Sequence, residues 1–284
     1  MLARIFSTIV IWAIAVFAIV YGKSYGFASM VMILSLAVNY EICTLLKKAD
    51  YKPILWYAQI STILIFVCSI SSKFLPSPFN FYVGDLVFTT ALIPLFIIIV
   101  KDPYGDYVKQ TIAPTVATIF ISPFMLKFYV LVASTGNGYE NIMFAVWIIA
   151  ATKFSDIGAY VIGCAFGRHK MAPTMSPNKT WEGAVGGILS SAVIGASFAW
   201  ICGKYGIFLK EITPIIAALI SIPIGMVAIV SDLLESVFKR RMGVKDSGAI
   251  IPGIGGAFDL ADSLILCAPL AYLAFLVLGI QNSI

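Results

Sequence analysis

Long apolar runs separated by short polar segments dominate this sequence. Several of these runs approach the length of about 20 mostly apolar residues that a helix needs to cross a membrane. The chain is 60% hydrophobic and only 12% charged, which leaves too little polar surface for a soluble domain. An alternating ten-residue pattern typical of outer-membrane barrel strands is not present in the sequence. We therefore expect an all-α polytopic membrane protein.

Nine runs are apolar enough to be predicted as transmembrane helices. They cover residues 5–21, 25–46, 54–71, 86–100, 112–133, 142–165, 184–202, 215–230 and 264–280. The first run lacks a clear small-residue cleavage site, so we expect it to be retained as a span and not removed as a signal peptide.

An odd number of spans places the two chain ends on opposite sides of the membrane. With this count, thirteen lysine and arginine residues fall in loops on the side of the N-terminus, and four fall in loops on the other side. Cytoplasmic loops carry the excess of basic residues in membrane proteins. We therefore expect a multi-pass protein of the inner or cytoplasmic membrane with a cytoplasmic N-terminus. Loops 166–183 and 231–262 then lie on the same, cytoplasmic face.

Residues 231–262 gather most of the late charge between two apolar runs. The charged residues of this segment are Asp232, Glu235, Lys239, Arg240, Arg241, Lys245, Asp246, Asp259 and Asp262. Carboxylates can hold a divalent metal ion, cations can hold phosphate groups, and the glycine-rich turn at residues 252–256 lets the backbone approach a ligand. The segment is typical of a nucleotide or phosphoryl-transfer site at a membrane surface.

A second polar segment runs from residue 153 to residue 187. Lys153 and Asp156 are three residues apart inside an apolar run, so they share a helix face and can pair. An ion pair within a membrane is costly unless it faces a cavity or a partner, which favours a site over a purely structural pair. Residues 176–180 precede the next apolar run, where they predict either an anion cradle at a helix N-terminus or a simple N-cap by Thr180. A P-loop is not indicated, because the sequence lacks GxxxxGK[ST].

Taken in order, these motifs resemble the phosphatidate cytidylyltransferase family, also called CDP-diacylglycerol synthases. The family signature, approximately S-x-x-K-R-x4-K-D-x-G-x3-P-G-H-G-G-x2-D-R-x-D, is matched by Ser236, Lys239, Arg240, Lys245, Asp246, Gly248, Pro252, Gly253, Gly255, Gly256, Asp259 and Asp262. Residues 156–160 and 176–183 resemble the family elements D-x-G-A-Y and S-P-x-K-T-x-E-G. The chain departs from the signature at Ile254, where the family has histidine, and at Leu260, where it has arginine.

The resemblance implies transfer of CMP from CTP to phosphatidate at the cytoplasmic membrane surface, giving CDP-diacylglycerol and pyrophosphate. It implies dependence on Mg²⁺, with room for a second metal ion. The implied partners are CTP, phosphatidate and membrane lipids, not nucleic acid, and a homodimer is compatible with the family.

The resemblance also assigns roles to individual residues. The metal ligands are expected to be Asp232 and Asp259. The catalytic residues are expected to be Lys239, Arg240, Lys245, Asp246 and Asp262. The substrate-binding residues are expected to be Asp156, Ser176, Asn178, Lys179, Thr180, Ser236, Gly255 and Gly256. We expect residues 1–141 to form a scaffold of about five helices and residues 142–284 to form the catalytic region.

Three alternatives remain open from the sequence. One is a kinase or cytidylyltransferase that uses CTP on another membrane lipid. Another is a transporter, because the intramembrane residues Glu41, Lys153 and Asp156 could serve an ion path. The last is a degenerate family member that has lost the activity. The departures from the signature at Ile254 and Leu260 would be consistent with such a loss.

Overall fold

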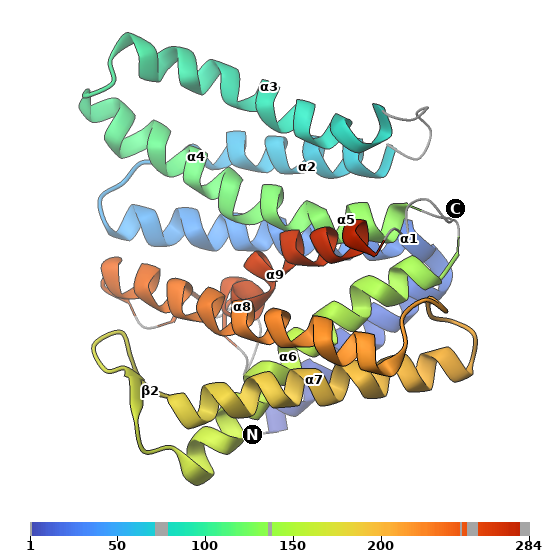
Figure 1. Ribbon diagram of the computed structural model, residues 1–284. Coiled ribbons are helices and arrows are strands. Elements are labelled where there is room, and N and C mark those ends of the chain that lie inside the picture. Colours follow the sequence, from blue (N-terminus) through green and yellow to red (C-terminus); the bar gives the residue numbers. More distant parts are fainter. Residues whose placement is uncertain (1, 72–78, 136–137, 245, 249–254, 279–284) are drawn as a thin grey trace. The chain divides into compact units, whose positions relative to one another are not determined.

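The computed structural model describes residues 2–71, 79–135, 138–244, 246–248 and 255–278 of the chain. Its helices are α1 (Leu2–Lys48), α2 (Leu55–Ser71), α3 (Phe79–Lys101), α4 (Ala113–Ile119), α5 (Met125–Ser134), α6 (Glu140–Phe166), α7 (Trp181–Lys204), α8 (Pro214–Arg241) and α9 (Ala257–Val277). Figure 1 shows this helical architecture, with one small hairpin formed by strands β1 (Lys170–Ala172) and β2 (Ser176–Thr180). The predicted all-α class is confirmed.

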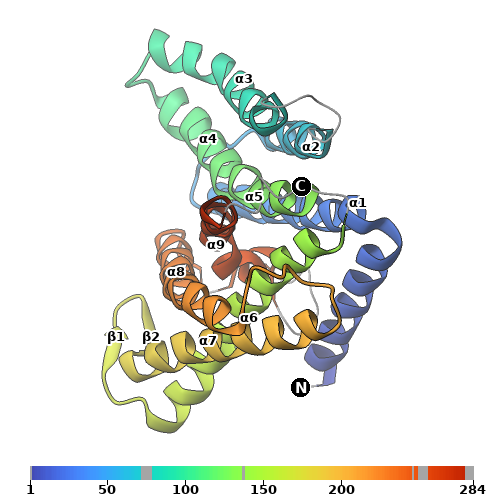
Figure 2. The ribbon, with the colours of Figure 1, turned by 45° about the vertical axis from the view of Figure 1, so that its right-hand side comes forward.

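Within the described residues, seven helical stretches are long and apolar enough to cross a membrane, and α2 is a shorter apolar helix of 17 residues. The chain is an integral membrane protein. The predicted count of nine is not exact, and the first two predicted spans both lie in α1, as two helical segments joined across a kink. This helix departs from helical geometry at Lys23 (φ 48°, ψ −134°), and Figure 2 shows the resulting bend. The kink falls within residues 22–24, the short joint that separates the first two predicted spans.

The contacts divide the chain into two compact units. The first unit contains Met1–Ser134 and Arg241–Ala261, and the second contains Thr135–Arg240 and Asp262–Ile284. Helix α9 therefore begins in the first unit and continues in the second. The predicted division into a scaffold and a catalytic region concerns roles and not contacts, so it stays a prediction.

The first unit has an apolar core between α2, α3 and the helical stretch that leads into α5. Its fully or nearly fully buried members are Ala58, Ile65, Leu92, Leu95, Val108, Ile112 and Ile119. Short π-helical segments, Val108–Ile112 and Phe120–Phe124, lie on either side of α4. Pro123 lies inside the second segment and has no N–H to donate, which suits a local widening of the helix.

One lysine is completely buried in this unit. Lys127 on α5 pairs with Asp85 on α3, and its ammonium group lies 4.5 Å from the ring centre of Phe124. A cation inside a membrane protein is costly unless it is paired, and a carboxylate together with an aromatic face provides such pairing. The unit is therefore held by an ionic contact as well as by apolar packing.

In the second unit, α6 and α7 run side by side at very short range (Figures 1 and 2). A Cβ atom added to Gly183 would lie 2.7 Å from the carbonyl oxygen of Ala159, and one added to Gly187 would lie 2.8 Å from the carbonyl oxygen of Ser155. Small residues allow such close approach between membrane helices. The close contact fixes α6, which carries Lys153 and Asp156, against α7.

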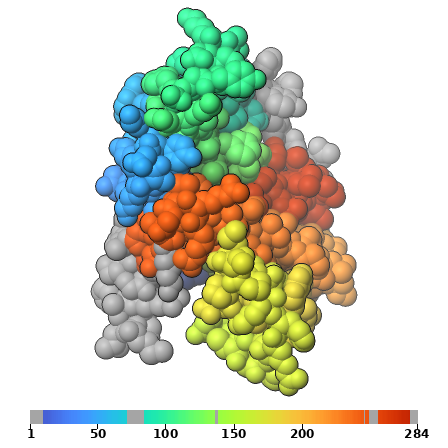
Figure 3. All heavy atoms as spheres, turned by 90° about the vertical axis from the view of Figure 1, so that its left-hand side faces the viewer, coloured from blue at the N-terminus to red at the C-terminus, as the bar shows by residue number. Residues whose placement is uncertain are grey.

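The loop predicted at residues 166–183 contains the hairpin. Its turn is closed by a hydrogen bond from the Met175 N–H to the Ala172 carbonyl (3.2 Å), with Pro173 in the position where its fixed φ suits a β-turn. The hairpin and the adjoining ends of α6 and α7 form the exposed yellow-green projection in Figure 3. The predicted loop thus contains a short antiparallel hairpin that leads directly into α7.

Candidate active site

Lys153 lies at the centre of a polar network in the second unit. Its ammonium group donates to Asp262 Oδ1 (3.2 Å) and Ser263 Oγ (2.8 Å) on α9, and it lies 3.5 Å from Asp156 Oδ2 on its own helix. The Ser263 hydroxyl in turn donates to Asp156 Oδ2 at 2.8 Å. We call these four residues the Lys153 network. The predicted pairing of Lys153 with Asp156 is confirmed, and α9 supplies a second carboxylate that the pattern within α6 could not reveal.

Two further ion pairs involve α8 in the same unit. Lys179 at the end of β2 lies 2.6 Å from Asp232, and Lys239 lies 2.8 Å from Glu235 one helical turn earlier. The Glu235 side chain is 3% exposed, whereas Lys179, Asp232 and Lys239 are half-buried. These charges are partly shielded from water. Their mutual interactions are therefore stronger than those of charges on an open surface. The hairpin therefore brings a cation to the carboxylates of α8.

Three carboxylates from α8 and α9 come together. Asp232, Glu235 and Asp262 each offer an oxygen atom, and these atoms lie within 4.8 Å of one another. We call them the carboxylate cluster. The Ser231 hydroxyl donates to the backbone carbonyl of Asp262 and so links the two helices at this point. Clustered carboxylate oxygens are the ligands that hard divalent cations such as Mg²⁺ prefer, so the donor set fits a metal site.

The two predicted metal ligands fall in different places. Asp232 belongs to the carboxylate cluster. Asp259 lies in the first turn of α9, within the first unit, where its Oδ2 accepts the backbone N–H groups of Gly256 (2.9 Å) and Ser247 (3.4 Å). The shared use of one ion by Asp232 and Asp259 stays a prediction.

The predicted substrate-binding residues on β2 behave in different ways. Thr180 is the N-cap of α7 and accepts the backbone N–H of Gly183 at 3.1 Å, as one of the two sequence interpretations required. Lys179 pairs with Asp232, Ser176 is half-buried and Asn178 is exposed. The N-cap by Thr180 does not decide between the two interpretations, because a phosphate cradle would use the same end of α7. The substrate-binding role of these residues therefore stays a prediction.

The remaining predicted residues lie along the second half of the chain. Lys239 is half-buried on α8, as is Ser236, and the Arg240 Nε donates to the carbonyl of Met175 in the hairpin at 3.4 Å. Asp246 is exposed after α8. Gly255 has φ 124°, a conformation that suits glycine, and Gly256 donates to Asp259. Lys245 and the turn residues 249–254 lie outside the described residues.

Sequence analysis assigned no site role to Glu235, Ser231 and Ser263, which the structure places among these groups, and it named Glu41, in the first unit, only for an alternative ion path. Glu235 completes the carboxylate cluster, and its spacing of three from Asp232 on a helix was a usable signal. Ser231 and Ser263 provide hydroxyls whose contacts depend on helix packing. Glu41 contacts the start of α9 from more than 200 residues away, and no local pattern indicates such a contact.

A carboxylate also fixes the entry to the hairpin. Glu182 in the first turn of α7 accepts the backbone N–H of Arg168 (3.1 Å) and lies 2.6 Å from His169 Nδ1. Negative charge at a helix N-terminus is favourable, because the first N–H groups are unpaired there. This contact holds β1 close to the start of α7 and so helps to position Lys179.

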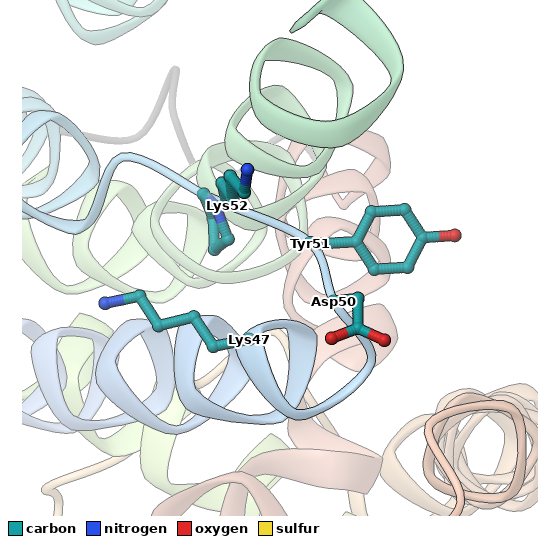
Figure 4. A pocket seen from close by; sticks show the side chains of 5 residues that line it. Lys47, Asp50, Tyr51 and Lys52 are labelled. Atoms are coloured by element: carbon teal, nitrogen blue, oxygen red, sulfur yellow. The ribbon is translucent and has the colours of Figure 1, made fainter. Parts of the chain in front are cut away.

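A surface hollow of about 350 Å³ lies in the first unit, at the turn between α1 and α2. It is lined by Lys47, Asp50, Tyr51, Lys52 and Pro53. Figure 4 shows the side chains of Lys47, Tyr51 and Lys52 extending in different directions, without converging on one point. None of the predicted site residues lines this hollow, and we assign no ligand to it.

Comparison with known proteins gives consistent matches. A family model described as "Cytidylyltransferase family" matches residues 2–278. A protein named phosphatidate cytidylyltransferase from Haemophilus influenzae is 37% identical over 145 residues, covering 51% of this chain and 50% of that protein. Proteins of the same name from Brucella suis (41% over 139 residues, 48% and 47% covered) and Mycobacterium bovis (32% over 177 residues, 61% and 53% covered) are also similar. The chain spans about half the length of these curated relatives.

Proposed function

Because the chain belongs to the cytidylyltransferase family, as its motifs predicted, we propose that it transfers CMP from CTP to phosphatidate. The products are CDP-diacylglycerol and pyrophosphate. The observation that carries the proposal is the carboxylate cluster of Asp232, Glu235 and Asp262, which is accompanied by Lys179 and Lys239. Oxygen ligands for a metal ion next to cations for phosphate groups are what transfer of a nucleotidyl group requires.

Asp232, Glu235 and Asp262 would hold Mg²⁺. A metal role for Asp259, which lies in the other unit, rests on the sequence motif alone. A bound Mg²⁺ supplies positive charge that neutralises the triphosphate and favours departure of pyrophosphate. The fit rests on the donor set, since carboxylate oxygens at short mutual distance match the preference of Mg²⁺.

The cations of the site hold the anionic substrates. Lys179 and Lys239 already lie beside the carboxylates, and Arg240 is held next to the hairpin by its contact with Met175. Together with Lys245 they provide positive groups for the phosphates of CTP and for the lipid headgroup. Fixed charges of this kind stabilise the charge that builds up in the transition state without forming a covalent intermediate.

The reaction forms a bond between a phosphate oxygen of phosphatidate and the α-phosphorus of CTP. It breaks the bond from that phosphorus to the oxygen that bridges to the β-phosphorus, and pyrophosphate leaves with the bonding electrons. The second pKa of a phosphate monoester is about 6, so the attacking oxygen is already ionised at neutral pH. The reaction therefore needs little help from a general base, and Ile254 and Leu260 are compatible with activity.

The membrane setting follows from the substrates. The acyl chains of phosphatidate stay in the bilayer, whereas CTP arrives from water, so the headgroup and the nucleotide meet at the membrane surface. The cytoplasmic surface is the side to which the nine-span prediction assigns the basic loops, and this assignment stays a prediction.

Product analysis tests the proposal against the other enzyme readings. Purified protein in mixed micelles is given CTP, Mg²⁺ and phosphatidate, and both lipid and water-soluble products are identified. The proposed activity releases pyrophosphate, whereas a lipid kinase releases CDP. Asp232→Asn should lose most of the activity, and Glu211→Gln, an exposed carboxylate change in the loop between α7 and α8, serves as the matched control. Release of CDP, or full activity of Asp232→Asn, would contradict the proposal.

A further inference from the structure

Glu41 on α1 is a buried carboxylate that the proposed chemistry does not use. Its side chain is 3% exposed and lies well inside an apolar helix. Glu41 Oε1 accepts the backbone N–H of Ala257 (2.9 Å), and Oε2 accepts that of Phe258 (2.8 Å) and the hydroxyl of Ser247 (3.1 Å). All of these residues belong to the first unit. We call this arrangement the glutamate clamp.

The glutamate clamp provides hydrogen-bond acceptors for the first backbone N–H groups of α9. The first N–H groups of a helix have no partner within the helix, and a negative charge near them is favourable. Caps normally come from the residue just before the helix, but here the acceptor lies 216 residues earlier in the chain. Hydrogen bonds to an ionised acceptor are roughly twice as strong as neutral ones. Glu41 therefore ties the beginning of α9 firmly to α1.

Two signature glycines leave room for this carboxylate. A Cβ atom added to Gly248 would lie 2.6 Å from Glu41 Oε1, and one added to Gly256 would lie 2.0 Å from Ser247 Oγ and 2.4 Å from Glu41 Oε2. Real Cβ atoms do not come so close to other atoms, so either change would displace the carboxylate, and the change at Gly256 would displace the Ser247 hydroxyl as well. The glycines at these two signature positions are thus explained by a residue that lies far outside the signature.

The clamp also acts on Asp259. The backbone N–H of Ser247 and that of Gly256 donate to Asp259 Oδ2, while the Ser247 hydroxyl and the next two N–H groups of α9 donate to Glu41. Ser247 therefore donates to both carboxylates, through its N–H group to Asp259 and through its hydroxyl to Glu41. Displacing Glu41 would release Ser247 and the first turn of α9, which together orient Asp259.

We propose that Glu41 is a positioning residue that joins Ser247 to the first turn of α9 and holds the Asp259 carboxylate in the orientation for binding a divalent ion. This inference rests on the proposed function in one respect, since Asp259 is a carboxylate assigned to the ion. Groups that orient metal ligands typically change metal affinity about 10- to 100-fold when they are removed. Loss of the clamp should therefore weaken ion binding by at least about tenfold.

Binding of Mn²⁺ by the purified full-length protein tests the clamp without requiring turnover. Electron paramagnetic resonance measures free Mn²⁺, and the variants are Glu41→Gln and Ser247→Ala. The matched control is Asn39→Ala on the same helix, because buried Asn39 donates to Thr62 Oγ1 (2.7 Å) and takes no part in the clamp. We expect both clamp variants to bind Mn²⁺ more weakly than the wild-type protein, with a smaller loss of affinity in Ser247→Ala than in Glu41→Gln. Asn39→Ala should bind Mn²⁺ with unchanged affinity, although its melting temperature should be lower.

A double-variant experiment makes the test sharper. Glu41→Ala and Gly248→Ala should each weaken Mn²⁺ binding, because one removes the carboxylate and the other displaces it. The double variant should bind like Glu41→Ala alone, since the added methyl group then meets no carboxylate. Additive losses would show that the two positions act independently and would overturn the proposal.

Two other results would also overturn it. In the first, Glu41→Gln binds Mn²⁺ as tightly as the wild-type protein but melts at a lower temperature, as Asn39→Ala does. Glu41 would then have a purely structural role. The other is unchanged hydrogen–deuterium exchange of the amides of Ala257 and Phe258 in Glu41→Gln. Failure of the proposed function looks different, because wild-type protein would then make no CDP-diacylglycerol while the exchange result still decides the clamp.

Discussion

Replacing Lys153 with methionine is the perturbation that most directly tests how the second unit is held together. The change keeps the length of the side chain but removes the cation from between Asp156 and Asp262, which lie 3.5 and 3.2 Å away. At an effective dielectric constant of about 20, each contact amounts to about 5 kcal/mol of Coulomb energy before desolvation is subtracted. Removing one partner of a buried ion pair costs about 3–5 kcal/mol in practice.

The lower end of that range applies here, because the Lys153 side chain is still 24% exposed. We expect Lys153→Met to lower the free energy of unfolding by about 3 kcal/mol, which is about two powers of ten in the folding equilibrium. For a chain of this size the melting temperature should fall by about 6–12 °C. A thiol-reactive dye can follow unfolding in detergent, since Cys43 and Cys267 are buried in the folded protein.

Two further variants make the Lys153 result interpretable. Lys210→Met, at an exposed position in the loop after α7, is the matched control and should change the melting temperature by less than about 2 °C. Adding Asp156→Asn to Lys153→Met should recover part of the loss, because one uncompensated carboxylate is removed. If Lys153→Met unfolds within about 1 kcal/mol of the wild-type protein, the Lys153 network is not a stabilising feature and the reasoning is wrong.

Four other changes test separate parts of the account. Asp50 has φ 65° at the end of α1, and Asp50→Gly should raise the free energy of unfolding by about 0.5 kcal/mol in the same dye assay. Thr180→Ala should lower it by about 1 kcal/mol because the N-cap of α7 is lost, whereas Thr180→Ser should not. Gly183→Ala should cost about 1–3 kcal/mol, because its Cβ would press on the Ala159 carbonyl, and wild-type stability would contradict the close approach of α6 and α7. Chelation of divalent ions should abolish CMP transfer, and Mg²⁺ but not K⁺ should restore it.

The membrane class and the ion pairing within α6 were predictable because they depend on local sequence. Apolar length predicts helices that cross a membrane, and a spacing of three places Lys153 and Asp156 on one face. The charged segment at residues 231–262 likewise indicated that Asp232 and Asp262 belong to a site, and the structure groups them with Glu235. These conclusions needed only the chain neighbours of each residue.

Other features depend on contacts that no local pattern reveals. The kink of α1 at Lys23 falls in the joint predicted between the first two spans, but its geometry (φ 48°, ψ −134°) could not be read from the sequence. The hairpin at residues 170–180 is short and rich in turn residues, so its pattern is indistinguishable from that of an irregular loop. The clamp joins Glu41 to Ala257 across most of the chain, and the room for it is provided by glycines whose purpose the signature alone did not explain.

Transfer of label from CTP is the most direct test of the central claim. Purified protein is incubated with phosphatidate, Mg²⁺ and CTP that carries ³²P at either the α- or the γ-phosphorus. The account predicts that the α-label enters the lipid fraction as CDP-diacylglycerol, with one pyrophosphate released for each lipid formed, and that the γ-label stays in pyrophosphate. Entry of the γ-label into lipid, or no labelled lipid from either substrate, would contradict it.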